Sequence, residues 1–159
     1  MASVRQTIVE ALAAKLEAIT TANGYNFEVG SDRVFRSAEN PTMIPTPAVV
    51  LIQGEENIEQ NYNNLYQCTL EIVVGFVDNY SGSDPETQAN LFLADIQKAM
   101  GVEFCIDITN SAGAASETTV IMLEEGNTIT ISEALPGFLI GQVNYEVQYR
   151  RNMLDPNKV

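Results

Sequence analysis

The sequence predicts an α+β fold, with a single mixed or antiparallel sheet and two amphipathic helices packed on one of its faces. Two segments carry apolar residues at helical spacing, and several others carry them in the alternation typical of strands. The predicted order is helix, two or three strands, a long strand, helix, and then two or three further strands. Runs of strands beside two helices favour an α+β architecture, and the length suits one domain over residues 1–159.

The first helix is predicted over residues 3–22. Ser3 and Gln6 have the spacing of a capping box, in which each side chain binds a backbone N–H group at the start of a helix. Asn23 and Gly24 supply a stop, because both tolerate the left-handed conformation that ends helices. The apolar face of this helix is expected to consist of Val4, Ile8, Leu12, Leu16 and Ile19.

Residues 25–36 are predicted to form a strand with a kink or bulge, because apolar and polar residues alternate on both sides of Gly30. Residues 37–47 contain three of the six prolines, so we expect an extended loop there. Residues 48–52 are apolar throughout, which is typical of a central strand covered on both faces. The polar residues 54–60 are expected to break that run.

Residues 65–77 alternate cleanly and predict a long antiparallel strand with one buried side. After a turn at 79–83, Asp84 and Pro85 are predicted to open the second helix, which Gly101 ends. The buried side of the strand is expected to carry Tyr66, Cys68, Leu70, Ile72, Val74 and Phe76. The apolar stripe of the helix is expected to consist of Ala89, Phe92, Leu93, Ile96, Ala99 and Met100.

The rest of the chain is predicted to be mainly strands. A short strand is expected at 104–106, followed by a loop of small and polar residues at 109–117. Strands at 118–123 and 128–131 flank a predicted turn at 124–127. The last strand covers 138–149, after a turn at 135–137.

The composition excludes several classes of function. The chain has 8 Lys and Arg against 21 Asp and Glu, a formal net charge of -13. Direct binding of DNA or RNA depends on basic residues that neutralise phosphates, and so does docking on an anionic membrane surface. Histidine, the commonest general base and transition-metal ligand, is absent from the sequence. We therefore expect an acidic globular protein that binds neither nucleic acid nor an anionic membrane surface directly.

Catalysis would have to come from carboxylates or a cysteine. Glu55, Glu56 and Glu59 form one acidic cluster and residues 124–125 another. Such carboxylates could perform acid–base chemistry or hold a hard cation, but glutamates in polar turns are usually solvated. Cys68 lies on the apolar side of a predicted strand, so we expect a buried, inert thiol. We expect no catalytic residue, cofactor or metal, and keep a carboxylate-based enzyme or metal-binding module as the alternative.

The few arginines offer a second kind of candidate site. Arg33 and Arg36 precede the proline-rich loop, and Arg150 and Arg151 end the last strand. Arginine suits bidentate pairing with a carboxylate of a neighbouring copy of the chain. Pairing within the chain, or simple solvation, is the alternative, since exposed ion pairs are common and weak.

The order and character of these segments resemble the tail terminator (tail completion) proteins of long-tailed bacteriophages. The similarity covers nearly the whole chain and involves no short motif. Besides the first helix, it is carried by residues 23–25 (Asn-Gly-Tyr), 32–36 (Asp-Arg-Val-Phe-Arg), 47–56 (Pro-Ala-Val-Val-Leu-Ile-Gln-Gly-Glu-Glu), 89–96 (Ala-Asn-Leu-Phe-Leu-Ala-Asp-Ile) and 143–150 (Val-Asn-Tyr-Glu-Val-Gln-Tyr-Arg).

The resemblance implies a structural virion protein that assembles as a homo-oligomeric ring, typically a hexamer. Such a ring caps the last layer of tail tube protein, ends tube polymerisation and provides the surface for a head-side connector protein. The sheath protein is a further partner in contractile tails, and DNA passes through the lumen. The nearest alternative is another neck protein, a head completion or adaptor protein that contacts the portal.

Under this reading the ring interface is heterologous and uses sheet edges and loops. Residues 37–47 or 78–84 are expected to bind the terminal ring of the tube, and 109–117 to become ordered on assembly. The candidate interface residues are Arg33, Arg36, Pro41, Met43, Ile44, Glu55, Glu56, Asp78, Tyr80, Arg150 and Arg151.

Overall fold

A computed structural model describes residues 3–36, 43–60, 64–80, 82, 84–109, 115–131 and 136–155. The helices are α1 (Val4–Glu17) and α2 (Pro85–Met100). The strands are β1 (Val34–Phe35), β2 (Ala48–Gln60), β3 (Leu65–Asn79), β4 (Glu103–Thr109), β5 (Ala115–Ile131) and β6 (Phe138–Asn152). No helix in these ranges is both long enough and apolar enough to span a membrane.

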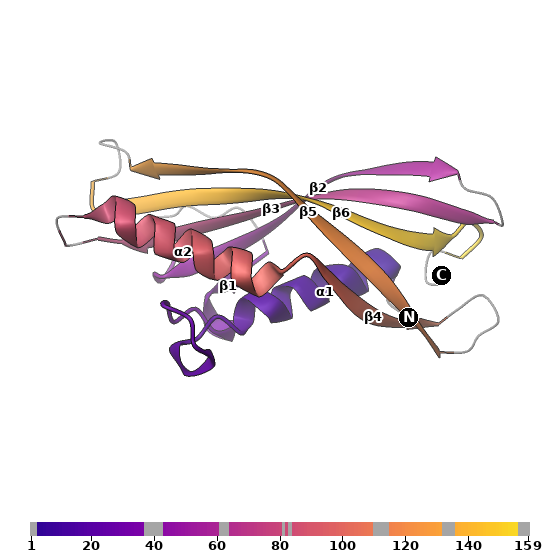
Figure 1. Cartoon of the computed structure of the whole chain (residues 1–159), viewed down its shortest axis with the longest axis horizontal. Coiled ribbons are helices and arrows are strands. Elements are labelled where there is room, and N and C mark those ends of the chain that lie inside the picture. The colour runs from indigo at the N-terminus through magenta and orange to yellow at the C-terminus, as the bar shows by residue number, and fades with distance from the viewer. Residues whose placement is uncertain are drawn as a thin grey trace.

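The six strands form one sheet in the order β1-β2-β3-β6-β5-β4. β1 pairs with β2 in parallel, and the four other pairings are antiparallel. Both helices lie on the same side of this twisted sheet (Figure 1). The predicted fold class, a single mixed sheet with two helices on one face, is confirmed.

The first helix begins as predicted and ends earlier than predicted. The Ser3 hydroxyl oxygen accepts a hydrogen bond from the Gln6 N–H at 3.1 Å. The helix ends at Glu17, because the next part of the chain makes other hydrogen bonds. The backbone N–H and hydroxyl of Thr21 both donate to the Glu28 carboxylate at 2.8 Å, and a 3-10 turn replaces the last helical turn. Gly24, with φ of 79°, ends that turn.

The second helix agrees with the prediction at both ends. The Asp84 carboxylate accepts a hydrogen bond from the Thr87 N–H at 3.0 Å, Pro85 is the first helical residue, and Gly101 follows the last. Because these signals are local, the sequence alone determines the limits of this helix. All six residues of its predicted apolar stripe are buried.

The core lies between the helices and one face of the sheet. The predicted inner face of β3 is confirmed, since Cys68, Leu70, Ile72, Val74 and Phe76 are buried and Tyr66 packs against them. Phe92 of α2 stacks on Phe27 with ring centroids 4.4 Å apart and contacts Phe76 at 4.9 Å. Aromatic pairs at these separations add about 0.5–1.5 kcal/mol each beyond the burial of area.

The predicted strand at 25–29 is wrong. Asp95 of α2 is 2% exposed, and its carboxylate accepts hydrogen bonds from the backbone N–H groups of Asn26 and Phe27 at 2.7 and 3.0 Å. The Asn26 side-chain amide adds a third bond at 2.8 Å. These backbone donors are therefore bound to a helix and cannot join a strand ladder. Of the predicted strand at 33–36, only β1 remains.

Two predicted interruptions of strands are also wrong. Residues 54–60 continue β2, and the expected turn at 124–127 lies inside the unbroken strand β5. Each site is a register shift, between Gln53 and Glu56 in β2 and between Glu124 and Gly126 in β5. A bulge inserts an extra residue and lets pairing resume beyond it.

The two bulges lie at the same level of the sheet. Gln53 pairs with Ile72, Ile72 with Tyr145, and Tyr145 with Glu124. We call this row of four residues the waist. Bulges increase the local twist, and the strands cross at the waist in the centre of Figure 1. The waist divides every long strand into two halves.

Other limits differ by a few residues. β4 and β6 are longer than predicted, and the predicted loop at 109–117 is shorter, because residue 109 ends β4 and residues 115–117 begin β5. Residues 110–114 lie outside the described part of the chain. The described helices cover the run at 48–52 on one face, while on the other face Ala48 is buried under Ile44 and Ile52 is 37% exposed, so the expected cover on both faces is present only in part.

Gly141 is required by the core. A Cβ atom at this position would overlap the Phe76 ring, whereas one at Gly75 on the neighbouring strand would lie 3.8 Å from its nearest atom. We expect Gly141→Ala to reduce the free energy of unfolding by about 1–3 kcal/mol, because overpacking forces the ring to move. Gly75→Ala is the control and should change it by less than about 1 kcal/mol. Urea denaturation measures both, and equal effects would contradict the assignment.

Candidate assembly surface

The face of the sheet opposite the helices, here called the open face, differs sharply on the two sides of the waist. Strand register assigns every second residue of β2, β3, β5 and β6 to this face. On the side where β2 and β6 begin, described residues of the open face carry no charge. This apolar half consists of Ala48, Val50, Ile52, Val73, Gly75, Val77, Phe138, Ile140, Gln142, Asn144, Thr128 and Thr130.

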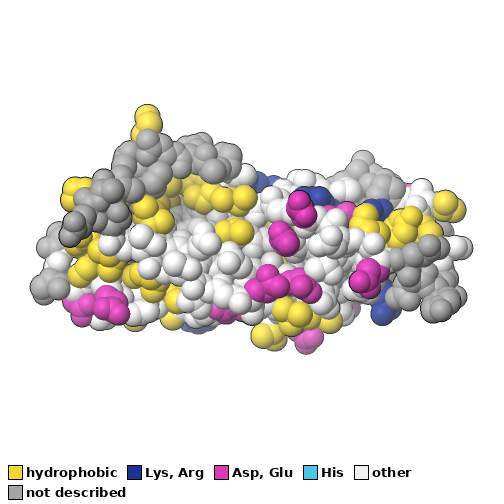
Figure 2. Space-filling model, turned by 90° about the horizontal axis from the view of Figure 1, so that it is seen from above, with side chains coloured by type: hydrophobic (Ala, Val, Ile, Leu, Met, Phe, Trp, Pro, Cys, Tyr) yellow, Lys and Arg dark blue, Asp and Glu magenta, His cyan; other side chains and the backbone are white. Residues whose placement is uncertain are grey.

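The other side of the waist carries the charges. Its open face, here called the acidic half, includes Asn57, Glu59, Gln67, Thr69, Glu71, Ile121, Leu123, Glu146, Gln148 and Arg150. Figure 2 looks onto the open face: hydrophobic side chains gather over its left part, and most acidic side chains lie over its middle and right parts. One face of the sheet thus presents two surfaces of different chemistry.

The apolar half contains a shallow groove of about 190 Å³. Val50, Val73 and Ile140 line it, and Ile44 closes one end by packing on Ala48 and Val77. The Ile52 side chain remains 37% exposed. An exposed apolar patch of this kind on a polar protein marks a surface that contacts another molecule.

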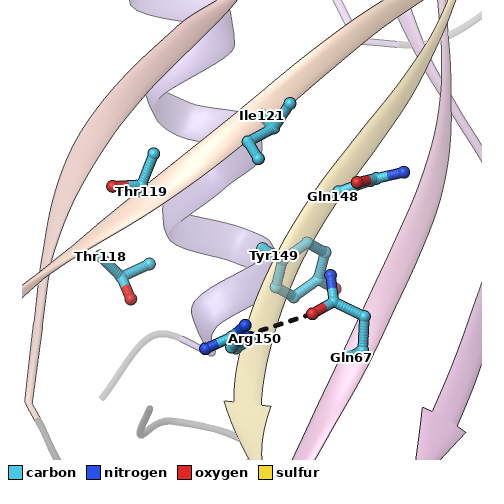
Figure 3. A pocket seen from close by; sticks show the side chains of 7 residues that line it. All are labelled: Gln67, Thr118, Thr119, Ile121, Gln148, Tyr149 and Arg150. Atoms are coloured by element: carbon cyan, nitrogen blue, oxygen red, sulfur yellow. Dashed lines mark hydrogen bonds between the residues drawn. The ribbon is translucent and has the colours of Figure 1, made fainter.

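The acidic half contains a pocket of about 330 Å³ where β5 separates from β6. β5 pairs with β6 only from Ile121 onward and with β4 before it, so the two strands form a fork. Figure 3 shows Thr118 and Thr119 on one side of this fork and Tyr149 and Arg150 on the other. The Arg150 Nε atom donates to the Gln67 side-chain oxygen at 3.3 Å.

This pocket offers hydrogen-bonding groups but no pair of acid and base. Arg150 is the one charged residue among those that line it. Within the described ranges, no group of three Asp, Glu or Cys side chains could hold a metal ion. The acidic cluster at 55–59 is also divided, because Glu59 lies on the open face and Glu56 on the helix side. The geometry therefore gives no support to a site built from these three glutamates.

Glu56 belongs to a structural cluster instead. The Tyr149 hydroxyl donates to its carboxylate, and Arg151 lies 3.6 Å from the second carboxylate oxygen. Burial and the Glu56 carboxylate both raise the pKa of Tyr149. The Arg151 guanidinium also lies over the Tyr66 ring, at 5.2 Å. Arg151 is thus paired within the chain, and Cys68, whose pKa is raised by burial, lies beside this cluster as a buried thiol.

Several predicted interface residues meet near the apolar half, where they join the chain to itself. An Arg33 guanidinium nitrogen donates to the backbone oxygen of Thr46 at 2.9 Å, and the Asn79 amide donates to the Thr46 hydroxyl at 2.8 Å. Asp78 is 8% exposed and accepts a hydrogen bond from the Gln88 amide at 2.6 Å. The Tyr80 N–H donates to the Gly137 oxygen at 3.0 Å.

The other predicted residues differ in accessibility. Met43 is 82% exposed at the margin of the apolar half, while Ile44 is buried. Arg36 and Glu55 are exposed. Pro41 lies outside the described residues. The predicted set is therefore spread over both halves of the sheet and does not form one patch.

Sequence reasoning missed the residues that make the apolar half a surface, chiefly Val50, Ile52, Val73 and Ile140. A signal was present, because the run at 48–52 is apolar on both strand faces while the sequence provides only two helices. Those helices can cover one face of the sheet, so the second apolar face needs cover from another source.

No family model matches this chain, and no curated protein matches it. Among solved structures, it is similar to a chain in the structure described as "Virion of native gene transfer agent (GTA) particle". The TM-score is 0.56 and the sequence identity 10%, over 94% of this chain and 99% of that chain. The likeness is one of fold, and it spans both chains almost completely.

Burial raises the pKa of the Asp78 carboxyl above its ordinary value of 3.8, although hydrogen bonds from Gln88 and Asn79 oppose this shift. Since the folded state binds this proton more tightly, the associated stability is present at low pH and lost as the pH rises through the raised pKa. We expect the stability of Asp78→Asn relative to the natural chain to increase between about pH 3 and about pH 7.

Asp84→Asn is the control, because hydrogen bonds from Thr87 lower the pKa of this exposed carboxyl. The stabilising contribution of the Asp84 carboxylate is lost as the pH falls through that lowered pKa. The stability of Asp84→Asn relative to the natural chain should therefore decrease as the pH rises, opposite to that of Asp78→Asn. Urea denaturation at a series of pH values measures both variants. Parallel curves for the two variants would refute the assignment to Asp78.

The cluster around Glu56 gives a second prediction. Glu56 and Arg151 are 14% and 16% exposed, so their ion pair is shielded from solvent. We expect Glu56→Gln to lower the free energy of unfolding by about 1–2 kcal/mol, because Arg151 loses its charged partner. Glu59→Gln, on the exposed acidic half, should change it by less than about 0.5 kcal/mol. Thermal denaturation compares them, and a larger loss for Glu59→Gln would contradict this account.

Proposed function

We propose that this chain is a structural protein of a phage-type virion that acts as a tail terminator. It assembles as a ring, six copies being the expected number, and caps the last layer of the tail tube. The ring ends tube polymerisation and provides the surface to which a head-side connector protein binds. The protein works by shape and charge at its surfaces and converts no substrate.

The observation that carries this proposal is the apolar half of the open face, which no helix among the described residues covers. A chain with a net charge of -13 keeps one part of its sheet free of charge, with Ile52 exposed and Val50, Val73 and Ile140 half-buried, which fits a surface that other chains cover. The likeness of fold to a chain of a gene transfer agent virion supports the same reading. So does the resemblance of the sequence to tail terminator proteins.

The acidic half suits the lumen of such a ring. Six copies at -13 each sum to -78, and carboxylates repel the phosphates of passing DNA at distances up to about 8 Å in physiological salt. Glu59, Glu71 and Glu146 lie together on this half. A channel through which DNA passes must not bind it, and an acidic surface repels DNA.

The proposed partners are other copies of the chain, the tail tube protein and the head-side connector, with the sheath protein as a further partner in a contractile tail. The exposed Met43 lies within the predicted loop at 37–47, for which contact with the tube is proposed. The mature location would be the neck of the virion, after assembly in the host cytoplasm.

The direct test is electron microscopy of particles assembled without this chain. We expect tails of abnormal length that do not join heads, because nothing stops the polymerisation of the tube or presents the joining surface. Supplying the natural chain should restore both properties. Normal tails joined to heads in its absence would refute the proposal.

A pull-down separates the proposed role from that of another neck protein. A tail terminator should capture assembled tube protein, whereas a head completion or adaptor protein should capture portal protein. Capture of portal protein alone would assign the chain to the second class.

A further inference from the structure

We propose that copies of this chain contact one another through the apolar half of the open face together with the free outer edge of β5, residues 126–131. This inference rests on the proposed function, because it assigns the self-contact of the ring. The occupant of the surface is a second copy of the same chain.

The outer edge of β5 is unpaired over its second half. β4 pairs with β5 only from Ala115 to Ile121, and one further bond joins the Met122 N–H to the Val102 oxygen at 2.8 Å. Among the described residues, no strand flanks β5 beyond that point. An unpaired edge presents backbone N–H and C=O groups that can pair with another chain.

The free segment has the composition of a strand that accepts a partner. Residues 126–131 read Gly-Asn-Thr-Ile-Thr-Ile and contain no charge and no proline. Proteins that must keep such an edge free usually protect it with charges, proline or a bulge within the exposed stretch. None of these devices occurs between residues 126 and 131, since the bulge of β5 precedes them.

Both edges carry a bulge with exposed glutamates, Glu124 and Glu125 in β5 and Glu55 in β2, but only β5 continues beyond its bulge without charge. Beyond its short pairing with β1, β2 carries the exposed Glu55 and Glu59 and a bulge. Arg5 of α1 donates to the Gly54 backbone oxygen at 3.3 Å and to the Gln53 side-chain oxygen at 3.0 Å, so one backbone acceptor of β2 is occupied. The uncharged stretch 126–131 of β5 is therefore the edge segment better suited to a partner.

The free edge and the apolar half form one continuous surface. Thr128 and Thr130 lie on the open face opposite Gln142 and Ile140, and a depression of about 210 Å³ joins these residues. A typical stable interface buries about 800 Å² on each partner. That is roughly a tenth of the 8433 Å² of accessible surface of this chain. The contiguous uncharged surface, together with a sheet edge, suits an interface of this class.

Charge favours this surface for contact with a second copy. Two chains that each carry -13 repel, so they can approach closely only where neither presents carboxylates. The apolar half and residues 126–131 satisfy this condition. A basic partner would instead be attracted to the acidic half, where Glu59, Glu71 and Glu146 lie.

The test compares Thr128→Lys and Thr130→Lys with the matched control Thr119→Lys. All three threonines are exposed on the open face of β5, and each variant has a net charge of -12 instead of -13. Circular dichroism should show the same fold for all. Light scattering over a concentration series should show self-association weakened at least about tenfold in the first two variants only, because they bury an unpaired ammonium group. If only the repulsion between the net charges of two copies mattered, all three variants should associate more strongly, since each lysine lowers the net negative charge.

A second measurement covers the case in which copies associate only on the tail tube. A photo-crosslinking residue in place of Thr130, in the full chain assembled on tails, should join one copy to another. Crosslinks to tube or connector protein alone would overturn the proposal, and so would unchanged association of the Thr128→Lys and Thr130→Lys variants. These outcomes would refute the interface but not the proposed function, provided that tails assembled without the chain are abnormal. Normal tails without the chain would refute the proposed function, whichever surface joins the copies.

Discussion

Two short helices cover a sheet of long strands, and this disparity in length governs the rest of the molecule. α1 and α2 have 14 and 16 residues, about 21 and 24 Å at 1.5 Å per residue. β3, β5 and β6 have 15 to 17 residues, about 50 Å or more at 3.3 Å per residue. The helices lie partly one after the other along one face (Figure 1), so neither is left to cover the second face.

The paired bulges turn that open face into two surfaces. A single extra residue reverses the side to which all later residues of a strand point. In β2 this places Glu56 on the helix side, where it meets Arg151 and Tyr149, and leaves Glu59 on the open face. Because β5 has its bulge at the same level, both strands change side in the same row. The charged residues of the open face therefore all lie on one side of the waist.

The sequence determined those elements whose signals are local. The cap at Asp84, the stop at Gly101 and the alternation of β3 all involve neighbours in the chain, and all were predicted correctly. The failures have distant causes. Asp95 lies about 70 residues from the backbone N–H groups of Asn26 and Phe27 that it binds, so no local pattern showed that 25–29 would not be a strand. A glycine with acidic neighbours predicts a turn as well as a bulge, and only pairing with other strands distinguishes the two.

The sequence implies that the sheet has a second apolar face, but it does not show which residues form that face. Apolar residues on both faces of 48–52 require cover on two sides, and two helices provide one side, so a partner was implied by the number of helices alone. Its location depends on which strands are neighbours: Val50 of β2, Val73 of β3 and Ile140 of β6 come from three separate segments. Periodicity assigns Val73 to the same strand face as Gln67 and Glu71. Only the position of the waist places Val73 in the apolar half and the other two residues in the acidic half. The same pairing leaves β5 without a neighbour beside Thr128 and Thr130, which joins an edge to the apolar surface. This surface is formed by residues of three strands and one strand edge, so it exists only once the whole sheet has formed. Its apolar side chains resemble those of a protein interior, and a second chain that packs on them would remove them from water.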